Sequence, residues 1–287
     1  MTKFDIHSND NSLFVTGQCN NRCLMCCQPP VSENDIEHIM RENLDMLKNS
    51  PLGLSDIGIT GGEPTLLKDK LFFLIKKITD RYPEATIHIL TNGREFRKGQ
   101  FTVCFSQYPQ ILFGIPLHSD ISTEHDYVTQ VEGSYYETMR GLYQLAAINA
   151  KIELRIVITR QNYQRLFNMS DFIWKNLPFV SYISFMGLED TGYAIKNEKK
   201  IWIDPILYKQ ELEKAVLNLN DWHMNVSIFN IPLCLLPNSL HIFARKSISD
   251  WKVKYLEVCT KCNKRIDCCG LFATSKRQSD YISPIIF

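Results

Sequence analysis

SLFVTGQCNNRCLMCC, residues 12–27, is a short β-rich run that leads directly into a loop with four cysteines. A loop that follows a strand lies at the carboxyl end of that strand, where barrel enzymes place their active sites. Cys19, Cys23 and Cys26 have the spacing C-x3-C-x2-C, which lets one loop surround an iron–sulfur cubane. Three thiolates leave one of the four irons without a protein ligand, so the spacing predicts a cluster with an open iron.

A structural metal knuckle, or three reduced thiols, would use the same cysteines and stays an alternative. Zinc sites usually take four ligands, and catalytic zinc typically recruits histidine or carboxylate. Neither histidine nor carboxylate occurs in GQCNNRCLMCCQPP, residues 17–30. The loop composition therefore favours iron and sulfur over zinc.

A second motif, ITGGEPTLL at residues 59–67, ends the next β-rich run with Gly61, Gly62, Glu63 and Pro64. Paired glycines let the backbone approach a ligand closely. Glu63 offers an acceptor for a cationic group. Alone, this motif could be only a strand-to-helix turn, but it follows the cysteine loop and lies at the same predicted end of the strands.

Short runs rich in Ile, Val or Phe alternate with helical patterns between residues 12 and 229, which is the order that builds parallel βαβ units. Strands are expected at 12–16, 56–60, 85–91, 111–116, 152–159 and 182–186, with 225–229 as a further candidate. Helices are expected at 36–47, 68–81, 135–147, 163–175 and 205–219. We therefore expect an α/β fold, a partial (β/α)6 barrel of the TIM type.

After residue 229 the pattern changes to loops with dense cysteines. We expect bound metal, rather than a hydrophobic core of its own, to stabilise this segment. Cys234, Cys259, Cys262 and Cys268 can converge on one centre, as split zinc or iron–sulfur sites do. A structural zinc is the alternative. The predicted domains are a barrel over residues 1–200 and a small loop-rich extension over 201–287.

The cysteine loop and the GGEP motif, in this order on the first two strands, resemble the radical S-adenosylmethionine (SAM) superfamily. The resemblance implies that Cys19, Cys23 and Cys26 bind a [4Fe-4S] cluster whose open iron is chelated by the amino and carboxylate groups of SAM. The GGEP segment would hold the amino group. An electron from the cluster would cleave SAM to methionine and a 5'-deoxyadenosyl radical, which abstracts hydrogen from a substrate.

Five further residues match SAM-contacting positions of the family, although each could equally be barrel structure. Thr91 and Asn92 resemble the TNG of the third strand. Arg155 resembles the basic residue of the fifth strand near the SAM carboxylate, and Asn162 the asparagine that follows it. Met186 resembles the sixth-strand residue near adenine.

Two family positions differ in this chain. Met25 stands where many relatives have an aromatic residue before the last loop cysteine, and we include it among the cofactor contacts. Pro116, Leu117 and His118 replace the SLD of the fourth strand. Ser119 or His118 would then supply the ribose contact.

The C-terminal cysteines resemble the twitch-type, short SPASM-like extension that holds an auxiliary [4Fe-4S] cluster. The spacing to Gly270 makes Cys268 a better match to that pattern than Cys269, and adjacent side chains of an extended segment point to opposite faces. The segments YISFMGLEDTGYA, IWIDP, IPLCLLP and SISDWKVKYLEVCTKC resemble the radical SAM maturases of the His-Xaa-Ser repeat peptide system, the C-type member in particular. This resemblance implies a ribosomally made peptide or small protein as substrate, and an electron donor such as flavodoxin or ferredoxin.

Composition limits the partners. Lys and Arg total 32 against 31 Asp and Glu, so no overall field attracts nucleic acid or an anionic membrane. No apolar run approaches the roughly 18 residues of a membrane span, and the first residues lack the order of a signal peptide. A cytoplasmic location is expected. There, ten cysteines favour metal binding or chemistry over disulfides, and the isolated Cys104 is expected to be a small buried hydrophobe.

Three other functions stay open beside peptide modification. Radical modification of a small molecule uses the same motifs. Modification of nucleic acid would use the basic stretch KCNKR, residues 261–265, but aromatic–basic interleaving is absent. A non-catalytic iron–sulfur or zinc protein with a regulatory role could also keep the fold.

Overall fold

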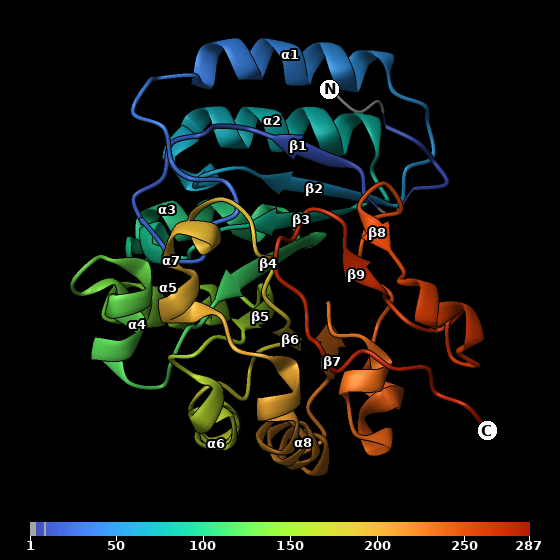
Figure 1. Ribbon diagram of the computed structural model, residues 1–287. Helices are drawn as coiled ribbons and strands as arrows, with labels where there is room; N and C mark the ends of the chain where they lie inside the picture. Colours follow the sequence, from blue (N-terminus) through green and yellow to red (C-terminus); the bar gives the residue numbers. More distant parts are fainter. Residues whose placement is uncertain (1–3, 9) are drawn as a thin grey trace. The chain divides into compact units, whose positions relative to one another are not determined.

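The computed structural model describes residues 4–8 and 10–287 of the chain. Its main sheet has seven strands in chain order (Figure 1). They are β1 (Ser12–Phe14), β2 (Asp56–Thr60), β3 (Thr86–Leu90), β4 (Ile111–Pro116), β5 (Lys151–Val157), β6 (Tyr182–Met186) and β7 (Val226–Phe229). The pairs β1–β2, β2–β3, β3–β4 and β6–β7 are parallel. This confirms the expected α/β class, and the candidate strand at 225–229 is a real seventh strand.

Eight α-helices lie between or after the strands in the described part of the chain. They are α1 (Ile36–Asn49), α2 (Asp69–Arg81), α3 (Gly99–Val103), α4 (Ser122–Thr129), α5 (Ser134–Ala147), α6 (Leu166–Asn176), α7 (Tyr193–Ile201) and α8 (Pro205–Asp221). The five predicted helices are confirmed to within about three residues at each end. Helices α3, α4 and α7 were not predicted, because each is too short to show a sustained apolar stripe. The described residues form no closed barrel, which agrees with a partial one.

The contacts divide the chain into two compact units. The first consists of residues 1–22, 28–116 and 133–153, and the second of residues 23–27, 117–132 and 154–287. The chain therefore passes from one unit to the other within the cysteine loop. The predicted domain boundary after residue 200 is a different kind of division, and it stays a prediction.

In the first unit, alternate residues of the strands are buried, as a sheet covered by helices requires. Ile57 and Ile59 of β2 and Ile87 and Ile89 of β3 have no exposed surface. The apolar stripe of α2 is equally buried. It consists of Leu71, Leu74, Ile75 and Ile78. Figure 1 shows α1 and α2 running alongside the first strands.

In the second unit, α6 packs against α8, and Asn218 donates a hydrogen bond of 2.9 Å to the Ser170 hydroxyl between them. The extension after β7 has little regular structure, as predicted. It contains short 3-10 turns and one antiparallel pair, β8 (Val253–Lys254) with β9 (Leu271–Phe272). None of the helices formed by the described residues has the length and apolar character needed to cross a membrane.

Candidate functional site

The paired glycines of the GGEP motif lie against the backbone of the cysteine loop itself. Gly62 donates its N–H to the Thr16 carbonyl at 2.6 Å, and Glu63 donates its N–H to the Gln18 carbonyl at 2.7 Å. A Cβ atom on Gly62 would lie 2.0 Å from the Gln18 oxygen, and Gly61 has a φ of +135°. Glycine is therefore required here because two backbone segments of the protein lie in direct contact. The close approach seen here is to Gln18, the residue before Cys19, and the expected approach of Gly61 and Gly62 to a ligand stays a prediction.

The Glu63 carboxylate is wholly buried and bonded to its own chain. Its Oε1 accepts hydrogen bonds from the Thr65 N–H at 3.0 Å and from the hydroxyls of Thr65 and Thr91, each at 2.6 Å. Its Oε2 accepts one from the Asn92 N–H at 2.7 Å. Burial raises the pKa of Glu63, and these four donors oppose that shift. The carboxylate thus joins the loop after β2 to the loop after β3.

Asn92 connects the loop after β3 to the first half of the cysteine loop. Its side-chain N–H donates to the Asn20 Oδ1 at 2.6 Å and lies 4.0 Å from the Cys19 Sγ. Cys19 is largely shielded from solvent, and this burial raises the pKa of its thiol to about 11. Because iron binds the thiolate, metal binding at Cys19 must displace a proton.

The second half of the loop, residues 23–27, is held within the second unit. The Leu24 N–H donates to the Val128 carbonyl at 2.9 Å, and the Tyr193 N–H donates to the Cys26 carbonyl at 2.8 Å. Leu24 and Met25 are buried in an apolar cluster with Val128, which also contains Ala194 and Ile201. Met25 therefore has a packing role in the structure, and its contact with a cofactor stays a prediction.

The predicted SAM contacts Ser119 and Asn162 shape the loops after β4 and β5. Asn162 has no exposed surface, and its side-chain amide donates to the carbonyls of His118 and Val157, each at 2.9 Å. The Ser119 hydroxyl is also fully buried and donates to Glu124 at 2.7 Å. Both side chains are thus bonded to the protein, and their SAM contacts stay predictions.

His118, the other ribose candidate, has a different environment. Its ring is 3% exposed, and neither ring nitrogen has a hydrogen-bond partner among the described residues. Burial, helped by the nearby His125 ring, holds the pKa of His118 well below its usual range. The ring is therefore neutral and keeps one donor and one acceptor for a ligand.

Arg155 and Met186 lie on β5 and β6, where the resemblance expects them. The Arg155 carbonyl accepts from the Leu117 N–H at 3.0 Å, and the Met186 carbonyl accepts from the Ile158 N–H at 2.9 Å. Both residues are partly exposed. Their backbones are therefore fixed while their side chains keep some access to solvent, and their contacts with SAM stay predictions.

The predicted auxiliary ligands meet at one cavity in the second unit. Cys234, Cys259, Cys262 and Cys268 all line it, and Tyr255 and Arg265 are also in its wall. Cys234 and Cys259 lie in 3-10 turns, whereas Cys262 and Cys268 lie in loops. Cys234 and Cys268 are 34 residues apart in the chain. Among the described residues, no group of three or more His, Cys, Asp or Glu side chains encloses a single metal-ion position.

The neighbours Cys268 and Cys269 differ sharply in environment. Cys268 lines the cavity, whereas Cys269 is buried in an apolar cluster with Ile248 and Phe272. A hydrogen bond from Cys269 lowers the pKa of Cys268 to about 6, and burial opposes it. The same bond raises the pKa of Cys269 well above its usual value. A thiolate is the metal-binding form of cysteine, so Cys268 is the better suited of the two.

The isolated Cys104 does not fit its predicted environment. We expected a small buried hydrophobe, but the residue is exposed at the end of α3. Its thiol donates to the Gln100 carbonyl at 3.4 Å, one helical turn earlier. The prediction was wrong because the apolar neighbours in FTVCF point to different sides of a helical segment rather than into one core.

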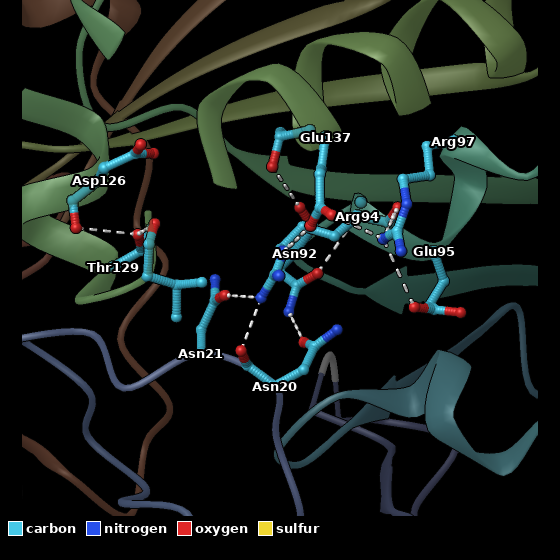
Figure 2. Close-up of polar contacts among 12 residues, drawn as sticks. Asn20, Asn21, Asn92, Arg94, Glu95, Arg97, Asp126, Thr129 and Glu137 are labelled. Carbon is cyan, nitrogen blue, oxygen red and sulfur yellow. Dashed lines mark hydrogen bonds and ion pairs between the residues drawn. The ribbon is translucent and has the colours of Figure 1, made fainter. Parts of the chain in front are cut away.

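Sequence reasoning missed a residue that contacts the cysteine loop, Arg94, and the carboxylate that pairs with it, Glu137. Arg94 bonds to Asn20 and Asn21, and Glu137 of α5 bonds to Arg94 (Figure 2). Arg94 directly follows the TNG motif, which was a usable signal. No sequence signal pointed to Glu137, because it lies on α5, 43 residues after its partner Arg94.

Comparison with known proteins identifies relatives by sequence. The profile of the Radical SAM superfamily matches residues 13–173. The GTP 3',8-cyclase of Nautilia profundicola is 25% identical over 210 residues, which make up 70% of this chain and 64% of that protein. The GTP 3',8-cyclase of Campylobacter jejuni subsp. doylei is 37% identical over 95 residues, or 32% of this chain and 29% of that protein.

Comparison of structures finds similar folds. Streptococcus suis SuiB bound to S-adenosylmethionine has a TM-score of 0.58 at 19% identity, covering 76% of this chain and 49% of SuiB. Native anSMEcpe with bound AdoMet and Kp18Cys peptide has a TM-score of 0.64 at 15% identity, covering 95% of this chain and 92% of that one. At these identities the likeness is one of fold. The chain spans 64% of the Nautilia protein and about half of SuiB.

We expect Glu63→Gln to destabilise the protein even without a bound cofactor. In the variant, the side-chain NH2 group of glutamine takes the place of one of the two carboxylate oxygens that accept hydrogen bonds from the four buried donors. Losing hydrogen bonds to a charged group costs about 1.5–3 kcal/mol of stability. Chemical denaturation of the metal-free protein measures the change. Glu84→Gln, at an exposed turn, is the matched control. Equal stability of the two variants would mean that the Glu63 carboxylate does not join the two loops.

Proposed function

Since the chain belongs to the radical SAM superfamily, whose members use a [4Fe-4S] cluster and SAM, we propose that it is a radical SAM enzyme that modifies a ribosomally made peptide. Cys19, Cys23 and Cys26 are the proposed cluster ligands. They lie within residues 19–26, so a single loop supplies all three. The observation that carries this assignment is the backbone pairing of this loop with the GGEP motif.

The chain's own residues would prepare the cofactor site in three ways. Glu63 and Asn92 fix the loops after β2 and β3 against the cysteine loop. Asn162 does the same between the loops after β4 and β5. The ring nitrogens of His118 have no partner in the part of the chain that the structure describes, so they could bind a polar ligand. The cluster and SAM, when bound, would supply the radical chemistry that removes hydrogen from the substrate.

The cavity lined by Cys234, Cys259, Cys262 and Cys268 supports an auxiliary [4Fe-4S] cluster. A cubane takes one thiolate at each of its four irons, and four cysteines provide them. Such a cluster would have no open iron for the substrate, so we propose that it passes electrons or stabilises the extension. Flavodoxin or ferredoxin is the class of electron donor that we propose.

Relatives and fold neighbours suggest different substrates. The curated relatives are named for GTP, whereas SuiB has been solved with the precursor peptide SuiA and anSMEcpe with the Kp18Cys peptide. A small-molecule substrate is therefore the second candidate. A cavity in the second unit favours the peptide, because its walls do not suit a triphosphate.

This cavity lies beyond the carboxyl ends of β6 and β7, and its wall is largely apolar. Trp202, Ile203, Tyr208 and Phe272 contribute to it. Among the described residues that line it, Arg277 is the only basic one. A triphosphate needs several cations or backbone donors to hold its charge. One arginine in an apolar wall suits an apolar side chain of a peptide better.

The charge of Arg277 is already compensated. Its guanidinium lies 4.4 Å from the centroid of the Trp202 ring and forms an ion pair with Glu198. The backbone N–H of Arg277 donates to Asp190, whose carboxylate is buried with Oδ1 unpaired among the described residues.

Anaerobic reconstitution tests the enzyme assignment. We expect about eight irons per chain and formation of 5'-deoxyadenosine from SAM with a chemical reductant, because each cysteine group has ligands for one cubane. Replacing Cys19, Cys23 and Cys26 with Ala should leave about four irons and no 5'-deoxyadenosine. Zinc in place of iron, or unchanged SAM cleavage in the triple variant, would refute the assignment.

A titration with GTP tests the substrate class. We expect calorimetry to show no saturable binding of GTP to the SAM-loaded protein below about 1 mM. A dissociation constant of that size corresponds to only about 4 kcal/mol of binding free energy. Small peptides encoded beside the gene are the matching positive probes, and mass spectrometry reports loss of hydrogen from them. Tight GTP binding with transfer of its hydrogen to 5'-deoxyadenosine would establish the small-molecule alternative instead.

Adjacent cysteines test the auxiliary cluster. We expect Cys268→Ala to lower the iron content by up to about four atoms per chain, whereas Cys269→Ala keeps the full content. The reason is that Cys268 lines the four-cysteine cavity and Cys269 packs in an apolar cluster. Cys104→Ala is the control for loss of a thiol outside both groups. Loss of iron from Cys269→Ala alone would assign the ligand to Cys269.

A further inference from the structure

A largely buried arginine holds the part of the cysteine loop that follows Cys19. Arg94 is 9% exposed and lies directly after the TNG motif of β3. One of its terminal nitrogens donates to the Asn20 carbonyl at 2.6 Å and to the Asn21 Oδ1 at 2.7 Å. The guanidinium therefore bonds to both residues after the first predicted iron ligand, as Figure 2 shows.

Glu137 of α5 balances the charge of this arginine. Its Oε2 accepts a hydrogen bond of 2.6 Å from the Arg94 Nε. Arg97 reaches the other oxygen of the same carboxylate at 3.1 Å, but its side chain is 32% exposed. A buried guanidinium without a carboxylate would be strongly destabilising, so the pair forms a unit. Arg94 is the member of this group that bonds to the loop.

A second set of bonds makes the contact rigid. The Asn92 Oδ1 accepts from the Arg94 N–H at 3.1 Å, and the Asn92 amide donates to Asn20 at 2.6 Å. Thr138, next to Glu137 on α5, donates its hydroxyl to the Asn92 carbonyl at 3.1 Å. Asn20 is thus hydrogen-bonded through both its side chain and its backbone carbonyl, and Asn21 through its side chain. Little freedom remains for the backbone that carries Cys19.

We propose that Arg94, balanced by Glu137, is a positioning residue for the first cluster: it fixes the backbone beside Cys19 and its positive charge helps to set the reduction potential. This inference rests on the proposed function, because it presumes iron at Cys19. Charge and hydrogen bonds near an iron–sulfur cluster set its potential, and groups that orient ligands affect metal retention about as strongly as some ligands do. Arg94 acts through the loop residues Asn20 and Asn21, so its proposed role is positioning rather than catalysis.

The alternative is a purely structural ion pair that joins the loop after β3 to α5. The two roles differ in the sign of their effects. Removing the Arg94 cation should shift the cluster potential to more negative values, because the reduced cluster carries the greater negative charge. Removing the Glu137 anion should shift it to more positive values. A merely structural pair would give no such opposite response.

The test uses the anaerobically reconstituted protein with both clusters and compares Arg94→Gln, Glu137→Gln and Arg97→Gln with the wild type. Redox titration followed by electron paramagnetic resonance gives the potential of the cluster whose signal changes when SAM is added. Iron release to a chelator gives its retention. Arg97→Gln is the matched control, because Arg97 contacts the same carboxylate but not the loop.

We expect Arg94→Gln to release iron about tenfold faster and to have the more negative potential. Glu137→Gln should have the more positive potential, and Arg97→Gln should resemble the wild type. Arg94→Lys keeps the charge but loses the forked donor, so it should release iron faster with little shift in potential. If Arg94→Gln does not fold, the iron release of Arg94→Lys tests the positioning role in its place.

Unchanged iron release and potential in Arg94→Gln would overturn the inference, as would shifts of the same sign in Arg94→Gln and Glu137→Gln. Failure of the proposed function looks different. In that case the wild type itself holds no cluster whose signal responds to SAM.

Discussion

The site depends on one buried carboxylate. Glu63 has no exposed surface, and its two oxygens accept hydrogen bonds from four donors on two loops. A buried anion in this position is tolerated because these donors compensate for the loss of water. The carboxylate therefore determines how the ends of β2 and β3 lie against each other. The cysteine loop is built on that arrangement.

The cysteine loop is added by contact of backbone with backbone. The N–H groups of Gly62 and Glu63 bond to the carbonyls before Cys19, at a distance that excludes any side chain on Gly62. Arg94 and Asn92 continue the contact to residues 20 and 21. The family motifs thus serve protein architecture as much as ligand binding. Apart from this site, the cavity around Trp202 and Arg277 offers a largely apolar, charge-balanced surface.

Much of the fold could be read from the sequence because the signals are local. Apolar residues at a spacing of two or of three to four indicated every strand of the main sheet and five of its helices. The short α4 and α7 gave no comparable signal. The cysteine spacing and the GGEP motif located the candidate cofactor site for the same reason: ligands on one loop must be close in sequence. Cys104 shows the limit, since its apolar neighbours implied a burial that the structure does not have.

The sequence by itself determined the class of fold, the family and the candidate iron ligands, since each depends on residues that are neighbours along the chain. Tertiary structure alone decided which groups are already bonded and which are free. It showed Glu63, Ser119 and Asn162 bonded within the protein, and the ring nitrogens of His118 without a hydrogen-bond partner among the described residues. It directed Cys268 rather than Cys269 into the four-cysteine cavity. It also paired Arg94 with Glu137. The physical reason is that burial and hydrogen-bond partners come from segments brought together by packing, and no local pattern records which segments will meet.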